Sequence, residues 1–375
     1  MSKTGKFLEQ LFQDKPIISD GAMGTILHLR GIRFDECFDH LNITQPALVG
    51  DVHRAYIDAG ASMIQTNTFG ANRYKLSQFG LENKVAEINL AAVELVRRVA
   101  SASFRDILIA GDVGPLGVRL APFGRVQLDD ARDAFKEQIQ VLVAAGVDVI
   151  IIETMTDFYE VREAILAARD VDPSIPVIAS MTFTRDDLTL LGDTPEKVAS
   201  SIHSAGADVI GINCSGGPLQ LLRILKKMKA AIPNGIYSVM PNAGWPEQQD
   251  GRIMYPAGPE YFGDYAISFW QAGAKVLGGC CGTTAEHIRA ISRRIEETNP
   301  SEIALGLEIP EMQPESEAEG EAPQSELAQK MDANQFLFAV EMDPPRGLST
   351  KKLLAGASLL ADSGADVINV ADSPM

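Results

Sequence analysis

The sequence has few cysteines, no long apolar run and a deficit of basic residues. Four cysteines in 375 residues are too few for a disulfide framework, so we expect a reducing, cytoplasmic location. No apolar stretch approaches the roughly 20 residues of a membrane helix, and the first residues lack the features of a secretory signal. The formal charge of -17 disfavours nucleic acid and anionic membranes as partners, because both require basic patches.

One phrase, in which a helix end is followed by a glycine and a buried strand, recurs along the chain. Its copies are "DAGASMIQTNT" from Asp58, "AAGVDVIIIET" from Ala144, "SAGADVIGINC" from Ser204 and "QAGAKVLGGCC" from Gln271. The small residue and glycine are typical of a helix C-cap, and the apolar run is typical of a strand buried on both faces. Four further apolar runs of this kind begin at Pro16, Ile107, Pro176 and Ile236.

These eight expected strands alternate with stretches of helical periodicity such as "KVAEINLAAVELVRRVA". Strands that are buried on both faces and alternate with helices indicate a parallel sheet. Eight such units in about 290 residues predict an α/β fold with an eight-stranded parallel TIM barrel. An open doubly wound sheet is the alternative, because periodicity alone cannot show closure.

Polar residues stand where the expected strands end, and in a barrel these ends form the catalytic rim. They are Asp20, Asn67, Asp112, Glu153, Cys214, Asn242, Cys280 and Cys281. In a closed barrel the eighth strand neighbours the first, and the sixth lies two strands away. The three thiols of the sixth and eighth strands can therefore meet above the barrel.

The stretch "GGCCG" places Cys280 and Cys281 side by side. In a regular strand their side chains would point to opposite faces, but the flanking glycines allow both sulfurs to face one point. Together with Cys214 they supply three thiolates, the protein-ligand number of a catalytic zinc site with an open fourth position. Soft sulfur ligands favour zinc over magnesium, calcium or manganese. The alternative is that all three are merely small buried residues. Cys37 and the five histidines show no such context, and we interpret them as incidental.

A zinc ion with three thiolates is a poor Lewis acid for water but a good site for another thiol, which loses its proton there. The turn "DGAMGT" from Asp20 could present free amides to a carboxylate, although by itself an ordinary strand-to-helix turn explains it equally well. Asp20 and Glu153 could bind an ammonium group. These features together describe a site for an amino acid with a thiol side chain.

The motifs "DGAMGT", "QTNTFGAN", "IIIETMTD", "GINCSGGP", "MPNAGWP" and "GGCCGTTAEHI" resemble those of the homocysteine S-methyltransferase family, in order and spacing, over roughly residues 10 to 295. The resemblance implies that Cys214, Cys280 and Cys281 bind Zn²⁺, with the homocysteine sulfur in the fourth position. It implies catalytic roles for these cysteines and Glu153, and methionine as the product. It further implies that Asp20 and Glu153 bind the substrate ammonium. The substrate carboxylate would be bound by the turn of Gly21, Ala22, Met23, Gly24 and Thr25. The pocket lining would include Asn67, Asn213 and Asn242.

The resemblance does not select the methyl donor. Members of the family use betaine, S-methylmethionine, S-adenosylmethionine or, through cobalamin, methyltetrahydrofolate. Two alternatives to methionine formation stay open: a homocysteine- and zinc-binding regulatory module without turnover, and methyl transfer to another small thiol.

The composition changes after the expected barrel, which we assign to residues 1–298. Residues 299–332 are rich in Glu and predict an acidic flexible linker, with a solvated helical extension as the alternative. Residues 333–375 read as strand, helix and strand, and "EMDPPRG" and "VADSPM" resemble the start of a methylenetetrahydrofolate reductase fused to such a methyltransferase. Glu341 would match its catalytic acid, and FAD would belong to the missing remainder. About 40 residues are far fewer than the roughly 200 that a barrel needs, so we expect no reductase activity from this chain.

Overall fold

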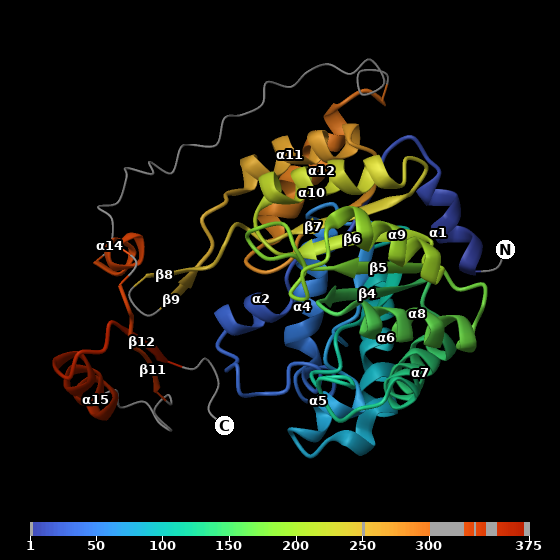
Figure 1. Cartoon of the computed structure of the whole chain (residues 1–375). Helices are drawn as coiled ribbons and strands as arrows, with labels where there is room; N and C mark the ends of the chain where they lie inside the picture. The colour runs from blue at the N-terminus through green and yellow to red at the C-terminus, as the bar shows by residue number, and fades with distance from the viewer. Residues whose placement is uncertain (1–2, 250–251, 301–325, 334, 343–350, 371–375) are drawn as a thin grey trace. The chain divides into compact units, whose positions relative to one another are not determined.

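The computed structural model describes residues 3–249, 252–300, 326–333, 335–342 and 351–370 (Figure 1). The chain divides into two compact units, Met1–Ile309 and Pro310–Met375, which are described separately. No helix in the described ranges combines the length and apolarity required to cross a bilayer.

The first unit is built on an eight-stranded parallel sheet with the strand order β1-β10-β7-β6-β5-β4-β3-β2. The strands are β1 (Ile17–Ile18), β2 (Met63–Gln65), β3 (Leu108–Val113), β4 (Val149–Met155), β5 (Val177–Met181), β6 (Val209–Cys214), β7 (Tyr237–Pro241) and β10 (Ala274–Leu277). The two end strands meet through a parallel bridge between Ser19 and Met63, and the Ser62 amide donates to the Ile18 carbonyl at 2.8 Å. The sheet therefore forms a nearly closed barrel, which confirms the predicted fold, and the open doubly wound alternative is wrong.

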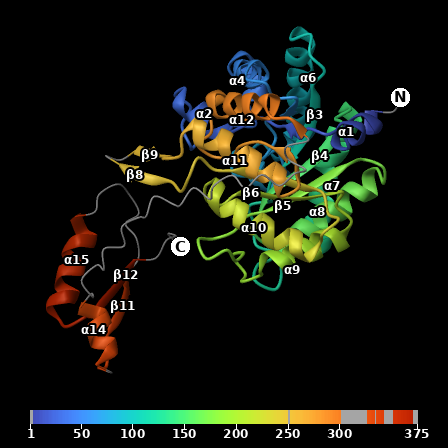
Figure 2. The same ribbon diagram turned by 90° about the horizontal axis from the view of Figure 1, so that it is seen from above.

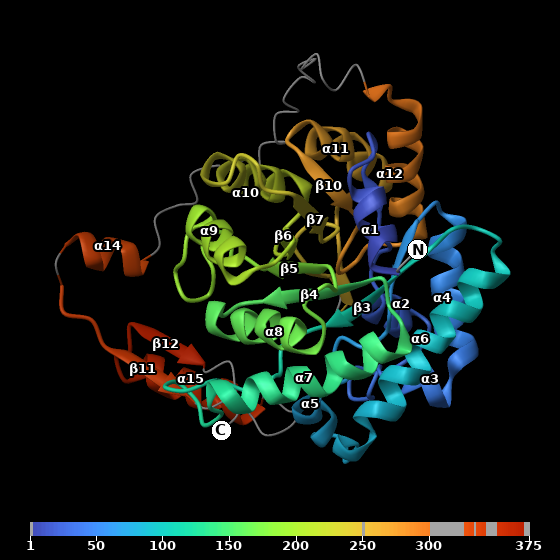
Figure 3. The ribbon, with the colours of Figure 1, turned by 90° about the vertical axis from the view of Figure 1, so that its right-hand side faces the viewer.

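Helices surround the barrel strands, as the view along the barrel shows (Figure 3). They are α2 (Gly24–Leu29), α3 (Leu41–Thr44), α4 (Pro46–Asp58), α5 (Arg73–Ser77), η1 (Glu82–Lys84), α6 (Val85–Ala102), α7 (Leu128–Ala145), α8 (Phe158–Val171), α9 (Pro195–Ala205), α10 (Pro218–Ala231), α11 (Pro259–Gln271) and α12 (Ala285–Glu297). The four glycines of the recurring phrase, Gly60, Gly146, Gly206 and Gly273, follow α4, α7, α9 and α11 with φ between 83° and 110°. This left-handed conformation, which glycine adopts without steric penalty, confirms that they end the helices before each strand.

The amino-terminal helix α1 (Lys3–Leu11) covers one end of the barrel. Its fully buried Phe7 and Leu11 pack in one apolar cluster with residues from all eight strands, including Ile17, Met63 and Val276. Lys6 Nζ also donates to the carbonyl of Ile107, which directly precedes β3. This helix therefore closes the amino-terminal end, opposite the rim where the polar residues stand.

An antiparallel hairpin, β8 (Glu247–Gln249) and β9 (Arg252–Met254), is inserted between β7 and α11. It extends away from the barrel strands (Figure 2). The sequence reading did not predict this hairpin, which begins directly after the motif "MPNAGWP".

The second unit contains α14 (Glu326–Asp332), β11 (Ala339–Met342), α15 (Lys351–Asp362) and β12 (Val367–Val370). The two strands pair in parallel, with Glu341 opposite Asn369. A helix between two parallel strands agrees with the predicted strand, helix and strand order. Residues 301–325 of the predicted linker, the Pro-Pro turn and the last five residues lie outside the described ranges.

Candidate active site

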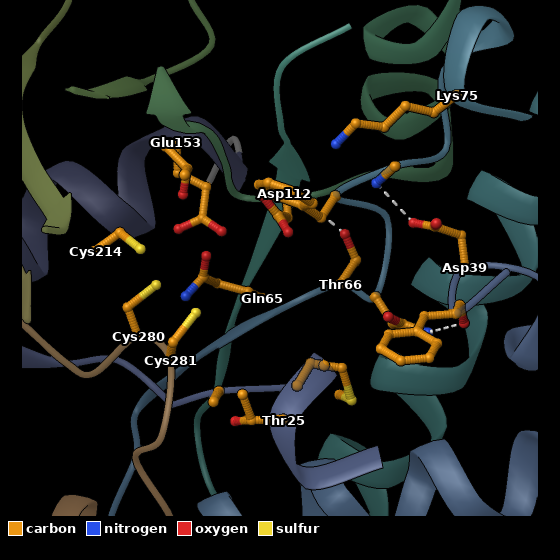
Figure 4. A pocket seen from close by; sticks show the side chains of 18 of the residues that line it. Thr25, Asp39, Gln65, Thr66, Lys75, Asp112, Glu153, Cys214, Cys280 and Cys281 are labelled. Carbon is orange, nitrogen blue, oxygen red and sulfur yellow. Dashed lines mark hydrogen bonds between the residues drawn. The ribbon is translucent and has the colours of Figure 1, made fainter. Parts of the chain in front are cut away.

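A cavity of about 430 Å³ opens at the carboxyl-terminal rim of the barrel. Most of the predicted site residues line it (Figure 4). These are Asp20, Gly21, Ala22, Met23, Gly24, Thr25, Asn67, Glu153, Cys214, Cys280 and Cys281. The cavity therefore lies at the carboxyl-terminal ends of β4 and β6 and is completed by the loops that follow β1, β2 and β10.

The structure brings the sulfurs of Cys214, Cys280 and Cys281 within 4.8 Å of one another. Cys214 is the last residue of β6, with a φ of 54° in the left-handed region. The vicinal pair does not stand at a strand end as predicted, because β10 ends at Leu277 and two glycines separate it from Cys280. The backbone there is held by loop hydrogen bonds, including one of 2.8 Å from the Cys280 amide to the Pro241 carbonyl. Leaving strand geometry is what allows both sulfurs to face Cys214.

Hydrogen bonding within the cluster separates the acidities of the three thiols. Hydrogen bonds from the thiols of Cys280 and Cys281 stabilise the thiolate of Cys214 and hold its pKa well below the ordinary value. Because Cys280 and Cys281 donate these bonds as protonated thiols, the same bonds raise their pKa values. One thiolate can thus be stabilised by two neighbouring thiols, whereas three thiolates require a cation among them. Three converging sulfur donors fit a zinc ion with one further position open.

Asn213 stands behind the cavity wall and connects the acid to the thiols. Its Nδ2 donates to Glu153 Oε2 at 2.9 Å and lies 3.9 Å from the sulfur of Cys280. Its Oδ1 accepts from the Thr154 amide at 2.8 Å, where Thr154 has an uncommon φ of 58°. A β-branched residue in this conformation is strained, and the Asn213 bonds help to hold it.

Asn242 also supports the wall from behind. Its Nδ2 donates to the carbonyl of Ser215, the residue after Cys214, at 2.7 Å. Asn67 does line the cavity, and its Nδ2 donates to the Phe38 carbonyl at 2.7 Å. The three asparagines therefore fix the backbone on which the lining residues stand.

Two carboxyl groups, those of the buried Asp20 and the half-buried Glu153, face the cavity close to the thiols. Burial raises the pKa of Asp20 to about 7, although both oxygens accept hydrogen bonds of 3.0 Å from Gln65. Burial raises the pKa of Glu153 to about 8, with additional repulsion from Cys214 and Asp20. A cation between these groups would offset both effects, so the site is suited to an ammonium group.

The turn after β1 is tied to the cysteine loop. The Ala22 amide donates to Thr283 Oγ1 at 3.1 Å, and the Gly282 amide donates to Thr25 Oγ1 at 3.2 Å. Gly21 is required at its position, because a Cβ there would lie 2.7 Å from Thr283 Oγ1. Movement of either loop would therefore disturb the other.

The sequence does not predict several of the lining residues, and the interpretation of Cys37 as incidental is wrong, because Cys37 lines the cavity. The others are Glu36, Phe38, Asp39, Gln65, Thr66, Phe69, Gly70, Lys75, Gln78, Phe79, Asp112, Thr154 and Gly279. Asp112 had been placed on the rim from its position in β3, but was given no role. Most of the rest come from loops after β1 and β2, where no residue spacing indicates which side chains turn inward.

The fold and the site define a (β/α)₈ barrel with a three-thiol cluster at its catalytic rim. The chain belongs to the homocysteine S-methyltransferase family, whose model matches residues 17–295. The match ends there, so the reductase resemblance of the C-terminal residues stays a prediction.

The chain is similar to proteins named methionine synthase from two mycobacteria. It is 31% identical over 315 residues to that of Mycobacterium leprae (strain TN) and 30% identical over 317 residues to that of Mycobacterium tuberculosis (strain ATCC 25618 / H37Rv). Each alignment covers 80% of this chain and 26% of the relative. The chain thus spans about a quarter of the length of the curated relatives it matches.

Solved structures of the Escherichia coli homocysteine methyltransferase MmuM share the fold. The oxidized form gives a TM-score of 0.64 at 24% identity, and the metallated form gives 0.64 at 25% identity. Both comparisons cover 78% of this chain and 100% of MmuM.

Proposed function

We propose that the barrel transfers a methyl group to the thiol of L-homocysteine and forms methionine. The observation that carries this proposal is the convergence of three sulfurs, within 4.8 Å of one another, in a cavity that also contains Asp20 and Glu153. Family membership, the similarity to methionine synthases and the metallated form of MmuM support it. The low cysteine content supports a cytoplasmic location.

Cys214, Cys280 and Cys281 would hold a Zn²⁺ ion. When bound, zinc would stabilise the thiolate form of the substrate and so provide a nucleophile at neutral pH. Asp20 and Glu153 would bind the substrate ammonium, and the backbone from Gly21 to Thr25 would receive its carboxylate. These contacts would direct the homocysteine side chain toward the thiol cluster.

The test combines metal analysis with a donor panel. We expect about one zinc per chain and methionine formation with one or more of betaine, S-methylmethionine, S-adenosylmethionine and methylcobalamin. Cys280→Ala should lose both zinc and activity, whereas Cys37→Ala, which alters the same cavity outside the cluster, should keep its zinc.

Full activity of a metal-free sample would refute the mechanism. Zinc and homocysteine binding without methionine from any donor would favour the regulatory module instead, and faster methylation of another thiol would favour a different acceptor.

For the domains, we propose that residues 1–298 form this catalytic barrel, that 299–332 connect it, and that 333–375 begin a reductase-like barrel. Support for the last proposal is limited to the motifs around Glu341 and the parallel pairing of β11 with β12.

A further inference from the structure

Lys75 is the only basic side chain among the described residues that line the cavity. It stands on α5, and its ammonium lies 4.0 Å from the centroid of the Phe69 ring. Two glycines make room for its stem, because a Cβ at Gly117 would lie 3.0 Å from Lys75 Cγ and one at Gly70 would lie 3.4 Å from Cδ. The side chain therefore packs in a defined slot and directs its charge into the cavity (Figure 4).

The charge of Lys75 contacts the face of the Phe69 ring but has no carboxylate or hydrogen-bond acceptor as a direct partner among the described residues. Its Nζ makes no hydrogen bond and no ion pair there, and burial lowers its pKa below the ordinary value. Asp112, which is 6% exposed, likewise has a buried Oδ1 with no hydrogen-bond partner in that part of the chain. Lys75 is half-buried and lacks a counter-ion in direct contact, so it is available to an anionic group of a ligand. Burial and the nearby carboxyls raise the pKa of Asp112, and a cationic group of a ligand beside it would favour its charged form.

The positions of these two groups differ from that of the proposed homocysteine site. Figure 4 shows Asp112 between Glu153 and Lys75, with the three cysteines on the opposite side of the cavity from Lys75. Homocysteine would extend from Asp20 and Glu153 to the thiols and take its carboxylate contacts at the turn after β1. The space near Lys75 and Asp112 then stays open for the second substrate.

We propose that Lys75 binds the carboxylate of the methyl donor, and that this donor is a small zwitterion whose methylated sulfonium or ammonium faces Asp112. This inference rests on the proposed function and deepens it. Besides the cysteines, the cavity is lined by the buried carboxyls of Asp20, Asp39 and Asp112, the half-buried carboxyl of Glu153 and one lysine, so its charge favours a cationic donor. A corrinoid fits less well, because the groups around its macrocycle are amides and offer Lys75 no carboxylate.

The transfer is balanced without a further reactant. The homocysteine thiol loses its proton to solvent, and its sulfur forms a bond to the donor methyl carbon. The bond between that carbon and the donor sulfur or nitrogen breaks, and its electron pair stays on the donor atom. The donor atom thereby loses its positive charge and becomes a thioether sulfur or a tertiary amine nitrogen, and the released product keeps its carboxylate and any other charged group.

The experiment compares Lys75→Met with wild-type protein on two matched pairs of donors. Methionine keeps the apolar stem in the slot but has no charge. The pairs are S-methylmethionine with (3-aminopropyl)dimethylsulfonium, its analogue without the carboxylate, and betaine with tetramethylammonium. For a carboxylated donor that the wild type accepts, the variant should raise the KM roughly 10- to 100-fold. The KM of the matching analogue, the KM of homocysteine and the zinc content should stay unchanged, and Lys75→Arg should restore part of the loss.

Other outcomes would overturn the inference. An equal rise in the KM of a donor and of its analogue would show that Lys75 does not bind the carboxylate. A raised KM of homocysteine alone would show that Lys75 contacts homocysteine instead. Wild-type turnover only with methylcobalamin would overturn the inference but leave the proposed function intact. Absence of methionine from every donor, with zinc bound, would refute the proposed function itself and the donor site with it.

Discussion

Asn213 and Glu153 are joined by a hydrogen bond of 2.9 Å, and Asn213 directly precedes Cys214 in β6. The proposed ammonium site and the thiol cluster are therefore held by one fully buried side chain. Because the same amide group also lies 3.9 Å from the sulfur of Cys280, a change at Asn213 should disturb both substrate binding and the thiol cluster.

The first prediction concerns Asn213→Ala. Loss of the bond to Glu153 should raise the KM of homocysteine about tenfold, which corresponds to about 1.4 kcal/mol. The Thr154 amide also loses its acceptor, so the free energy of unfolding should fall by about 1–3 kcal/mol. Steady-state kinetics and denaturant unfolding measure the two effects. Asn213→Asp keeps an acceptor for Thr154 but places a second carboxyl group beside Glu153, so it should not recover substrate affinity. A normal KM in both variants would contradict this role.

The second prediction concerns Gly282→Ala, next to the cysteine pair. Gly282 has a φ of 78°, and a Cβ there would lie 2.2 Å from Tyr255 Cγ. The loop must shift to relieve this contact, so the zinc content measured by elemental analysis should fall well below that of the wild type. Gly31→Ala is the matched control, because Gly31 also has a positive φ of 99° but nothing lies within 4 Å of its Cβ position. The control should lose about 1 kcal/mol of stability and keep its zinc. Equal zinc in both variants would show that the loop tolerates the shift.

The third prediction concerns Asp20→Asn, which is nearly isosteric. The variant removes the negative charge proposed to bind the substrate ammonium, so the KM of homocysteine should rise roughly 10- to 100-fold. Its zinc content should not change, because Asp20 is not part of the thiol cluster. Calorimetric titration of homocysteine into the zinc-loaded variant would check this directly. Unaltered affinity would leave Glu153 as the sole acid of the ammonium site.

The fourth prediction concerns the pH dependence of stability. His53 is fully buried in α4, neither ring nitrogen has a hydrogen-bond partner in the described residues, and burial lowers its pKa from 6.5 to about 4. Above pH 6.5 neither the folded nor the unfolded state binds a proton at this residue. Between pH 6.5 and 4 only the unfolded state does, so stability falls as the pH falls, by about 3 kcal/mol in total.

His53→Leu should remove most of this dependence. The melting temperature of the variant should exceed that of the wild type at pH 5 by more than it does at pH 8, because an unpaired buried polar ring is replaced by an apolar side chain. His203→Gln, at an exposed position of α9, serves as the control and should keep the wild-type slope. An unchanged slope in His53→Leu would assign the acid sensitivity to other groups.

The sequence predicts most of the barrel because local rules determine each unit. Gly60, Gly146, Gly206 and Gly273 end their helices, and the apolar runs that follow can only be buried strands. The thiol cluster was predictable for the same reason, since topology alone places the ends of β6 and β10 on one rim. The inward direction of Lys75 was not predictable, because it depends on Gly70 and Gly117, which come close only after folding. The hairpin was missed because its residues carry no alternating pattern.

Because α1 covers the opposite end of the barrel, both substrates of the proposed reaction would enter the cavity from the carboxyl-terminal rim. In that reaction, a substrate that binds deeper in the cavity would have to bind before the other one and leave after it. A saturating concentration of the outer ligand would then slow the release of the inner one. The shape of the cavity would in this way determine the order of substrate binding. The rate of product release would depend on that order even where the chemical step is fast.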